Sequence, residues 1–205
     1  MKRTRQAHFA HPWRVHTLAA DFELLDVWRF EVRLDERRGF DAFLETYWEA
    51  IHAVERSPLS RMRMAIGRVM GWDAAPNSRP IPGCVEHLVA ERLDAADRAR
   101  NRFAADEPSP LPVAKVRPVY RFDDEALWEV SNDTVHALMH VSCAVGAAPE
   151  LAVYIKSRGL FTRLYMAAIW PARHAIIYPS LMSLVERHWN AAPRAETERG
   201  DIKRR

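Results

Sequence analysis

The sequence is poor in cysteine and glycine, with two cysteines and seven glycines among 205 residues. Cys84 and Cys143 lie far apart and outside any metal-binding spacing, so neither a disulfide framework nor a cysteine metal site is predicted. There is also no glycine-rich phosphate loop, no Gly-x-Ser-x-Gly elbow and no His-Glu-x-x-His motif. These absences remove the usual signatures of nucleotide binding, serine hydrolysis and zinc proteolysis, and we expect no cofactor and no metal.

Long hydrophobic runs are missing as well. The longest uninterrupted apolar run covers residues 164–172, which is too short to cross a bilayer. No apolar stretch follows the basic residues Lys2, Arg3 and Arg5, so a signal peptide is not predicted. We therefore expect a cytoplasmic protein without stable membrane insertion.

The chain has little net charge outside its two ends. Residues 1–5 and 201–205 together hold six basic residues against one acidic residue, so the +3 of the whole chain becomes −2 for residues 6–200. A nucleic-acid-binding domain would carry a basic patch or stripe. We expect no nucleic acid as a partner.

Length and composition fit one domain, since 205 residues with 48% hydrophobic content can bury a core. We expect a flexible N-terminal arm over residues 1–16, a single domain over 17–190 and a flexible polar tail over 191–205. The arm contains His8, His11 and His16. A metal site there and a mobile tail are both open, and the mobile tail is the simpler interpretation.

The first half of the domain shows one strand pattern followed by two helix patterns. Residues 27–34 alternate between apolar and charged side chains, which predicts a half-buried strand. Apolar residues spaced three and four apart predict amphipathic helices over 40–54 and 58–70. Pro58 suits the first position of the second helix, and Gly71 ends it.

The second half predicts an antiparallel meander. Strands are expected over 116–122, 126–130 and 134–145, and a further strand follows the loop 146–150. A two-residue turn at Asn132-Asp133 would fix the register of the central pair. The cross-strand partners expected from that turn are Val130 with Val135, Trp128 with Ala137, Glu129 with His136, Leu127 with Leu138, and Glu125 with His140. On the next strand we expect Val141 beside Ile155, Cys143 beside Val153, and His140 beside Lys156. One face of the meander is then apolar, and both histidines lie on the other face.

The last long segment, 160–189, is apolar around most of its circumference up to Val185, which is typical of a helix buried inside a protein. Pro171 and Pro179 each remove a backbone donor and predict a bent helix or two helices in succession. The order of elements is strand, two helices, meander and long helix. It indicates an α+β helix-grip fold (START-like), in which a curved antiparallel sheet wraps around the C-terminal helix and two short helices follow the first strand.

Several short motifs add a resemblance to a known family. In chain order they are Asp21-Phe-Glu-Leu-Leu-Asp-Val-Trp28, Ile66-Gly67 with Gly71-Trp72-Asp73, Ile81-Pro-Gly83, Glu129-Val-Ser-Asn-Asp-Thr-Val-His136, Ala152-Val-Tyr-Ile-Lys156 with Gly159, Tyr165-Met-Ala-Ala-Ile169 with Pro171, Arg173-His174, and Tyr178-Pro179. Through them, most of residues 17–189 resembles the bacterial domain-of-unknown-function family 2867, which looks related to the START and polyketide-cyclase superfamily. The resemblance implies a helix-grip fold and supplies no catalytic residues. The family usually has phenylalanine where Ala172 stands, which removes a large apolar anchor from this helix.

Two glutamate–histidine couples are the candidates for acid–base chemistry. A carboxylate beside an imidazole fixes its tautomer and raises its pKa, as a general base requires. Glu129 with His136 is the first candidate couple, and Glu125 with His140 is the second. The alternative, which we favour, is that both are cross-strand pairs on an outer, solvent-exposed face. His136 and His140 lie too far apart along a strand, roughly 13 Å, to share a metal ion.

Arg173 and His174 interrupt the apolar C-terminal segment and must find polar partners. They are expected either to anchor the polar end of a ligand or to form structural bonds with a strand. The leading hypothesis for function is a module that binds a small apolar ligand between the sheet and the C-terminal helix. The expected lining residues are Trp28, Phe30, Trp128, Met139, Tyr165, Ile169, Arg173 and His174.

Two other functions remain open. One is a cyclase-like or dehydratase-like enzyme that uses Glu129 with His136, or Arg173 with His174, for proton transfer. The other is a protein-interaction module that uses Trp13, Trp72 or Trp170 and would show an exposed apolar patch.

Overall fold

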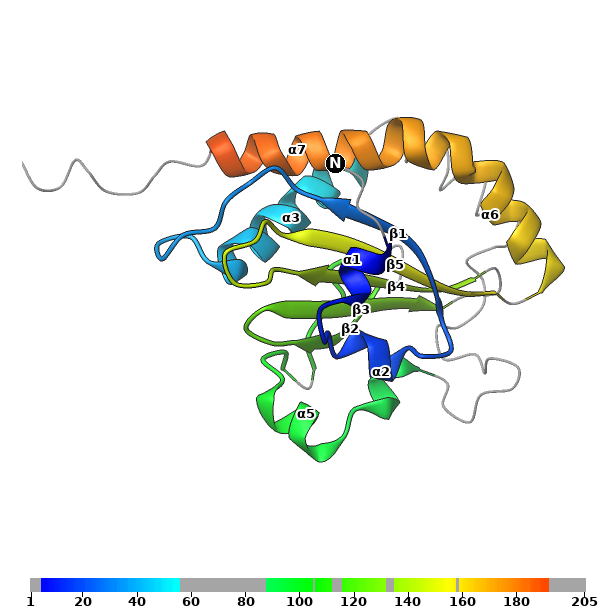
Figure 1. Cartoon of the computed structure of the whole chain (residues 1–205), viewed down its shortest axis with the longest axis horizontal. Helices are drawn as coiled ribbons and strands as arrows, with labels where there is room; N and C mark the ends of the chain where they lie inside the picture. The colour runs from blue at the N-terminus through cyan, green and yellow to red at the C-terminus, as the bar shows by residue number, and fades with distance from the viewer. Residues whose placement is uncertain are drawn as a thin grey trace, which may run out of the picture.

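The computed structural model describes residues 5–55, 88–104, 106–111, 116–131, 135–157 and 159–191. The second helix expected over 58–70 lies outside these ranges, as do Trp72 and Cys84. Figure 1 shows the arrangement, in which helices cover both faces of a single sheet.

The centre of the fold is a five-stranded antiparallel sheet with the strand order β1-β5-β4-β3-β2. Its strands are β1 (Glu23–Arg29), β2 (Arg117–Arg121), β3 (Glu125–Ser131), β4 (Val135–Ser142) and β5 (Glu150–Ser157). The α+β class is thus correct. β1 ends earlier than the alternation over 27–34 predicts, but Phe30 and Val32 beyond its end are still buried, so the alternation reports the core correctly.

The predicted register is wrong by an even number of residues. Ser131 pairs with His136 and Trp128 with Met139, so β4 is shifted by two residues against β3 relative to a tight turn at Asn132-Asp133. On β5, Met139 pairs with Val153, a shift of four residues. Because side chains alternate between faces with a period of two, an even shift leaves every residue on its predicted face.

Helices α3 (Phe40–Glu55) and α7 (Tyr178–Ala191) pack against each other and cover one face of the sheet (Figure 1). The core on this side is strongly aromatic, and Phe30 lies edge-on to both Phe43 and Tyr47. Its buried members include Trp28, Phe30, Phe43, Leu44, Tyr47, Trp128, Val141, Leu151, Met182, Val185 and Trp189. The apolar face of the meander therefore meets α7, as the alternation predicts.

The opposite face of the sheet is also covered, which differs from the expectation of an outer face. Two short helices, α1 (Arg5–Phe9) and α2 (Val15–Leu18), lie across it together with the 3₁₀ helix η1 (Val89–Arg92), and α5 (Ala95–Arg100) follows η1 (Figure 1). A second core forms there from Trp13, Val15, Leu18, Phe22, Leu24, Val27, Val89, Leu93, Tyr120, Leu127, Leu138, Ala152 and Tyr154. Residues 5–16, expected as a flexible arm, are thus packed against the sheet.

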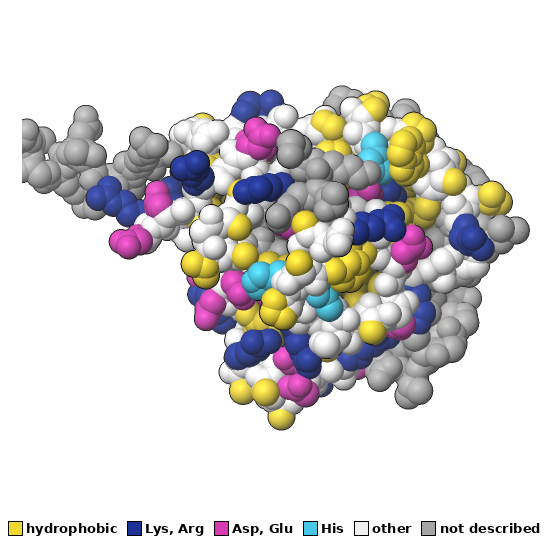
Figure 2. Space-filling model, in the orientation of Figure 1, with side chains coloured by type: hydrophobic (Ala, Val, Ile, Leu, Met, Phe, Trp, Pro, Cys, Tyr) yellow, Lys and Arg dark blue, Asp and Glu magenta, His cyan; other side chains and the backbone are white. Residues whose placement is uncertain are grey.

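The C-terminal segment is bent, and only its second half is buried. It consists of α6 (Leu160–Ala172), a π-helical turn η2 (Arg173–Ile177) and α7. Such a turn lies where Pro171 and Pro179 interrupt helical hydrogen bonding. The expectation of a wholly buried helix is wrong for α6 and η2, because Leu164, Trp170 and Ile176 are exposed. Figure 2 shows apolar side chains gathered over this part of the surface.

No helix in the described ranges combines the length and the apolar character needed to span a bilayer.

Candidate functional site

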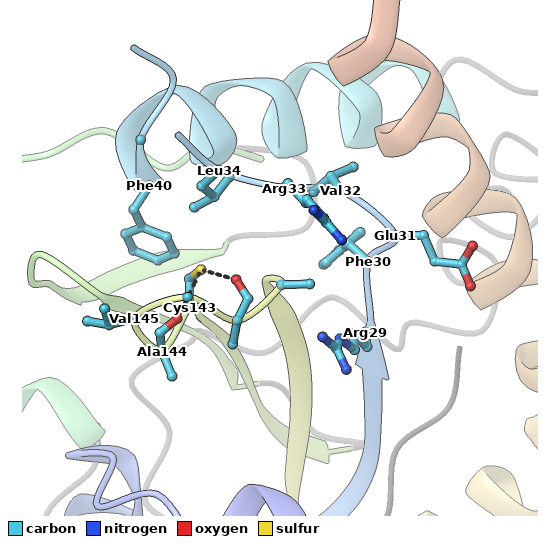
Figure 3. Close-up of a pocket in the computed structure, with 14 residues that line it drawn as sticks. Arg29, Phe30, Glu31, Val32, Arg33, Leu34, Phe40, Cys143, Ala144 and Val145 are labelled. Carbon is cyan, nitrogen blue, oxygen red and sulfur yellow. Dashed lines mark hydrogen bonds between the residues drawn. The ribbon is translucent and has the colours of Figure 1, made fainter. Parts of the chain in front are cut away.

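A hollow of about 790 Å³ opens at one end of the sheet, and we call it the groove. One wall is the chain from Arg29 to Leu34, which leaves β1 and runs toward α3. The other wall is the loop 143–148, which joins β4 to β5. Phe30 N–H donates to Pro149 O at 3.0 Å and ties the two walls together at the base. Figure 3 shows this arrangement.

The base of the groove is apolar and continuous with the core beneath α7. Phe30, Val32 and Phe40 line it and are all buried members of that core. Leu34 and Val145 extend the apolar surface toward solvent. These buried side chains support the base of the groove from behind, and Phe30 is wholly covered.

The rim of the groove is basic. In Figure 3 the Arg29 and Arg33 side chains reach toward the hollow, whereas Glu31 points away. The backbone N–H of Glu31 donates to Glu186 Oε1 on α7 at 2.8 Å, which anchors this stretch to the C-terminal helix. Two guanidinium groups over an apolar base suit a molecule that has an apolar body and an anionic end.

Cys143 is the nucleophile candidate nearest the groove, and the structure makes it inert. Its Sγ donates to the carbonyl oxygen of Ala147 at 3.4 Å. Burial, assisted by the nearby Asp124, raises the pKa of the Cys143 thiol to about 11. The thiolate is the reactive form of cysteine, and a raised pKa leaves little of it near neutral pH. The half-buried Cys143 side chain therefore serves as part of the apolar wall.

The predicted ligand-binding residues are dispersed. Phe30 lines the groove, whereas Trp28 and Trp128 are buried in the core and Met139 packs against it. Ile169 is half-buried on α6, and nothing is described of the Tyr165 side chain.

Arg173 and His174 are brought together by a carboxylate that sequence reasoning missed. Asp26, which is 2% exposed, accepts from Arg173 Nη2 at 2.7 Å through Oδ2, and its Oδ1 lies 2.8 Å from His174 Nε2. The register of β1 shifts between Leu24 and Asp26. The available signal was an acidic residue in an otherwise apolar stretch of strand. Burial raises the pKa of the neighbouring Tyr178 hydroxyl. This cluster attaches η2 to β1, which agrees with the structural interpretation of the Arg-His pair.

Both glutamate–histidine couples form, but neither faces solvent. His136 Nε2 lies 3.1 Å from Glu129 Oε2, and His140 Nε2 lies 2.9 Å from Glu125 Oε2. Both imidazoles are 0% exposed. They lie on the face away from α7, as predicted, under a cover that the sequence analysis did not anticipate.

Glu125 is the centre of a dense network. Its Oε1 accepts from the backbone N–H of Arg14 at 2.9 Å, and its Oε2 accepts from the Tyr120 hydroxyl at 2.7 Å as well as contacting His140. Burial alone would raise the pKa of Glu125, but the hydrogen bonds and the charge of His140 outweigh it and lower that pKa. The N-terminal segment is thus bonded to the sheet through this carboxylate.

The histidines of the N-terminal segment join the same region. His8, 1% exposed, lies with Nε2 2.9 Å from the Tyr154 hydroxyl, and its ring is 5.2 Å from that of His16 and 5.5 Å from that of His140. Burial lowers the pKa of His16, and the nearby His140 and His11 lower it further. Within the described ranges, no group of three or more His, Cys, Asp or Glu side chains is placed to hold a metal ion.

Comparison with known proteins identifies a family. Residues 18–180 match the family described as "Protein of unknown function (DUF2867)". No curated protein and no solved structure matches the chain. Because the match covers well over half of the sequence, the chain belongs to the DUF2867 family of proteins of unknown function.

Proposed function

We propose that this protein is a ligand-binding module of the helix-grip type and that the groove takes a small apolar molecule with an anionic end. The topology supports the helix-grip assignment. β1 pairs with β5, the strand that directly precedes the C-terminal helices, and α7 lies across the face between them. The groove lies beside this core, between the chain that leaves β1 and the loop that leads into β5.

The observation that carries the proposal is the groove itself. Its volume of about 790 Å³ falls in the range of roughly 300–1,000 Å³ typical of small-molecule sites. Apolar residues form its base and two arginines form its rim, so it offers burial for a hydrocarbon body and charge for a carboxylate or sulfonate. The proposed binding position differs from the position predicted from the sequence, because two of the predicted lining residues, Trp28 and Trp128, are already packed in the core.

The test uses 1-anilinonaphthalene-8-sulfonate, an apolar fluorophore with one anionic group, and decanoate as a competitor. We expect saturable fluorescence enhancement with the full chain, reversed by decanoate. A blocking variant is available because a Cβ at Gly39 would meet nothing within 4 Å and the residue lines the groove. Gly39→Leu should fill the opening without backbone strain and abolish the decanoate-sensitive signal.

A matched pair of arginine variants tests the rim. Arg33 lines the groove and Arg37, in the same loop, does not, although both are exposed. Arg33→Ala should weaken decanoate binding about 1.5-fold to fivefold, since an exposed charge contact is worth roughly 0.2–1 kcal/mol. Arg37→Ala should leave it unchanged. If Arg33→Ala and Arg37→Ala bound decanoate equally well, and Gly39→Leu bound it as tightly as the unmodified chain, the groove would not be the binding site.

Proton-transfer chemistry is the alternative function, and its candidates do not meet at the groove. Arg173 and His174 engage Asp26, while Glu129 and His136 lie on the other face of the sheet. The binding function is therefore favoured.

A further inference from the structure

A second hollow, of about 650 Å³, lies at the other edge of the sheet, and we call it the Glu129 hollow. It is bounded by η1 with the segment that follows α5 on one side, and by β2 on the other. Its apolar walls come from Leu88, Leu93, Phe103, Val116 and Val119, and Glu129 on β3 is also a lining residue. It shares no lining residue with the groove, so it is a separate place on the molecule.

Glu129 has an unequal environment at its two oxygens. Oε2 accepts from the backbone N–H of Val89 at 2.9 Å and lies 3.1 Å from His136 Nε2. Oε1 is shielded from solvent, since the residue is only 1% exposed. It also has no hydrogen-bond partner among the residues that the structure describes. A carboxylate offers about four acceptor positions, and leaving a buried acceptor without a donor is energetically unfavourable.

Ser109 supplies a second, independent observation at the same hollow. Its Oγ is also shielded, again without a hydrogen-bond partner in the described part of the chain, and the residue lines the hollow. Ser109 and Glu129 come from segments 20 residues apart that meet only in the folded chain. Each of these two lining residues thus has an unsatisfied polar atom beneath the wall of the hollow, and a few such polar groups are what orients a ligand in an apolar site once they are reached.

We propose that the Glu129 hollow binds a small molecule that has an apolar body and an N–H or O–H donor, with Glu129 Oε1 as the acceptor and Ser109 as a second polar contact. His136 and Val89 position the carboxylate by holding Oε2, which leaves Oε1 for the ligand. Because neither atom is open to bulk water, binding has to move the side chains around the hollow. Backbone amide signals of its lining residues therefore report binding directly.

The experiment titrates the full, ¹⁵N-labelled chain with benzyl alcohol, benzylamine and toluene. These probes have the same ring and differ in carrying a hydroxyl donor, an ammonium donor or no donor. We expect shifts at the amides of Ala90, Asn101 and Val119, with at least one donor probe binding about tenfold more tightly than toluene. The stronger of the two donors then distinguishes an alcohol-type ligand from an amine-type ligand.

Three variants assign the effect. Glu129→Gln keeps the shape, and its amide oxygen takes the Val89 contact, so an NH₂ group replaces the acceptor and benzylamine binding should fall about tenfold. Ser109→Ala, a milder change, should weaken the donor probes by about twofold to fivefold. Glu49→Gln is the control, because that exposed carboxylate on α3 lines neither hollow, and it should leave binding unchanged.

Each contrary result overturns the proposal. Equal affinity for toluene and both donors would show that no acceptor is used, and retained benzylamine binding in Glu129→Gln would show that Glu129 is not that acceptor. If an ordered water molecule remained hydrogen-bonded to Glu129 Oε1 at a saturating concentration of the probe, then water and not the ligand would be the donor to that atom. Gly39→Leu should not affect these titrations, so failure here is separable from failure at the groove.

Discussion

The two glutamate–histidine couples are nearly identical in sequence and strand position, yet they differ in what covers them. Both connect β3 to β4 on the face away from α7, and both imidazoles are fully buried. Glu125 uses both oxygens and is bonded to three separate parts of the chain, whereas Glu129 uses one oxygen and lines a hollow. The comparison shows that the role of such a couple depends on the segment packed over it and not on the couple itself.

The largest expected effect comes from removing the more fully bonded carboxylate. Glu125→Ala leaves the Tyr120 hydroxyl, the Arg14 N–H and His140 without their shared acceptor in a buried site. Breaking a buried charged network costs about 3–5 kcal/mol, so the free energy of unfolding should fall by that amount. Denaturant unfolding followed by tryptophan fluorescence measures it. A loss below about 1 kcal/mol would contradict the network described here.

A smaller effect is expected at the other couple. Glu129→Ala removes the acceptor of Val89 N–H and the contact of His136, but it also removes an oxygen that was itself unsatisfied. We expect a loss of about 1–3 kcal/mol in the same unfolding experiment. A loss equal to that of Glu125→Ala would mean that the two environments are energetically alike, and the comparison would fail.

The smallest effect concerns pH. The folded state lowers the pKa of His16 from its ordinary value of 6.5, so the unfolded chain binds a proton there more readily. The contribution of His16 to the free energy of unfolding is therefore fully present above pH 6.5, and it is lost as the pH falls below that value. The lowered pKa of Glu125 acts in the same direction but only near and below its ordinary value of 4.5.

His16→Gln separates these two contributions. It should flatten the pH dependence of unfolding between pH 7 and 5 while leaving the loss below pH 4.5, and thermal melts across that range measure both. His52→Gln on α3 is the control, since that residue lies on the other side of the sheet. An unchanged slope in His16→Gln would show that His16 is not the group responsible.

Much of the fold follows from side-chain alternation, which survives errors of register. The predicted pairing of Trp128 with Ala137 is wrong, but Trp128 still faces α7, since the error is two residues and the period is two. The Glu129–His136 and Glu125–His140 contacts also survive, because a residue displaced by two along the neighbouring strand stays within reach of a long side chain.

What sequence reasoning missed is the second core. Polar residues such as His136 and Glu129 at alternate positions indicate a solvated face, and only the tertiary structure shows a cover over them. The apolar residues of that cover, including Trp13 and Val15, are too few and too close to the N-terminus to form a strong local pattern. Likewise Asp26 lies just outside the strand predicted over 27–34, but it falls within β1 and is a buried anchor for Arg173.

The pairing of β1 with β5 has a consequence for the order in which the chain is made. Glu23 pairs with Ile155, so β1 leaves the ribosome long before its partner has been synthesised. At about 5–20 residues per second, the strand waits on the order of 7–26 seconds with its backbone groups unpaired. Closing so long a loop is also entropically unfavourable until the meander exists to receive the strand. A nascent chain halted before β5 should therefore be a good client for chaperones that hold extended apolar segments.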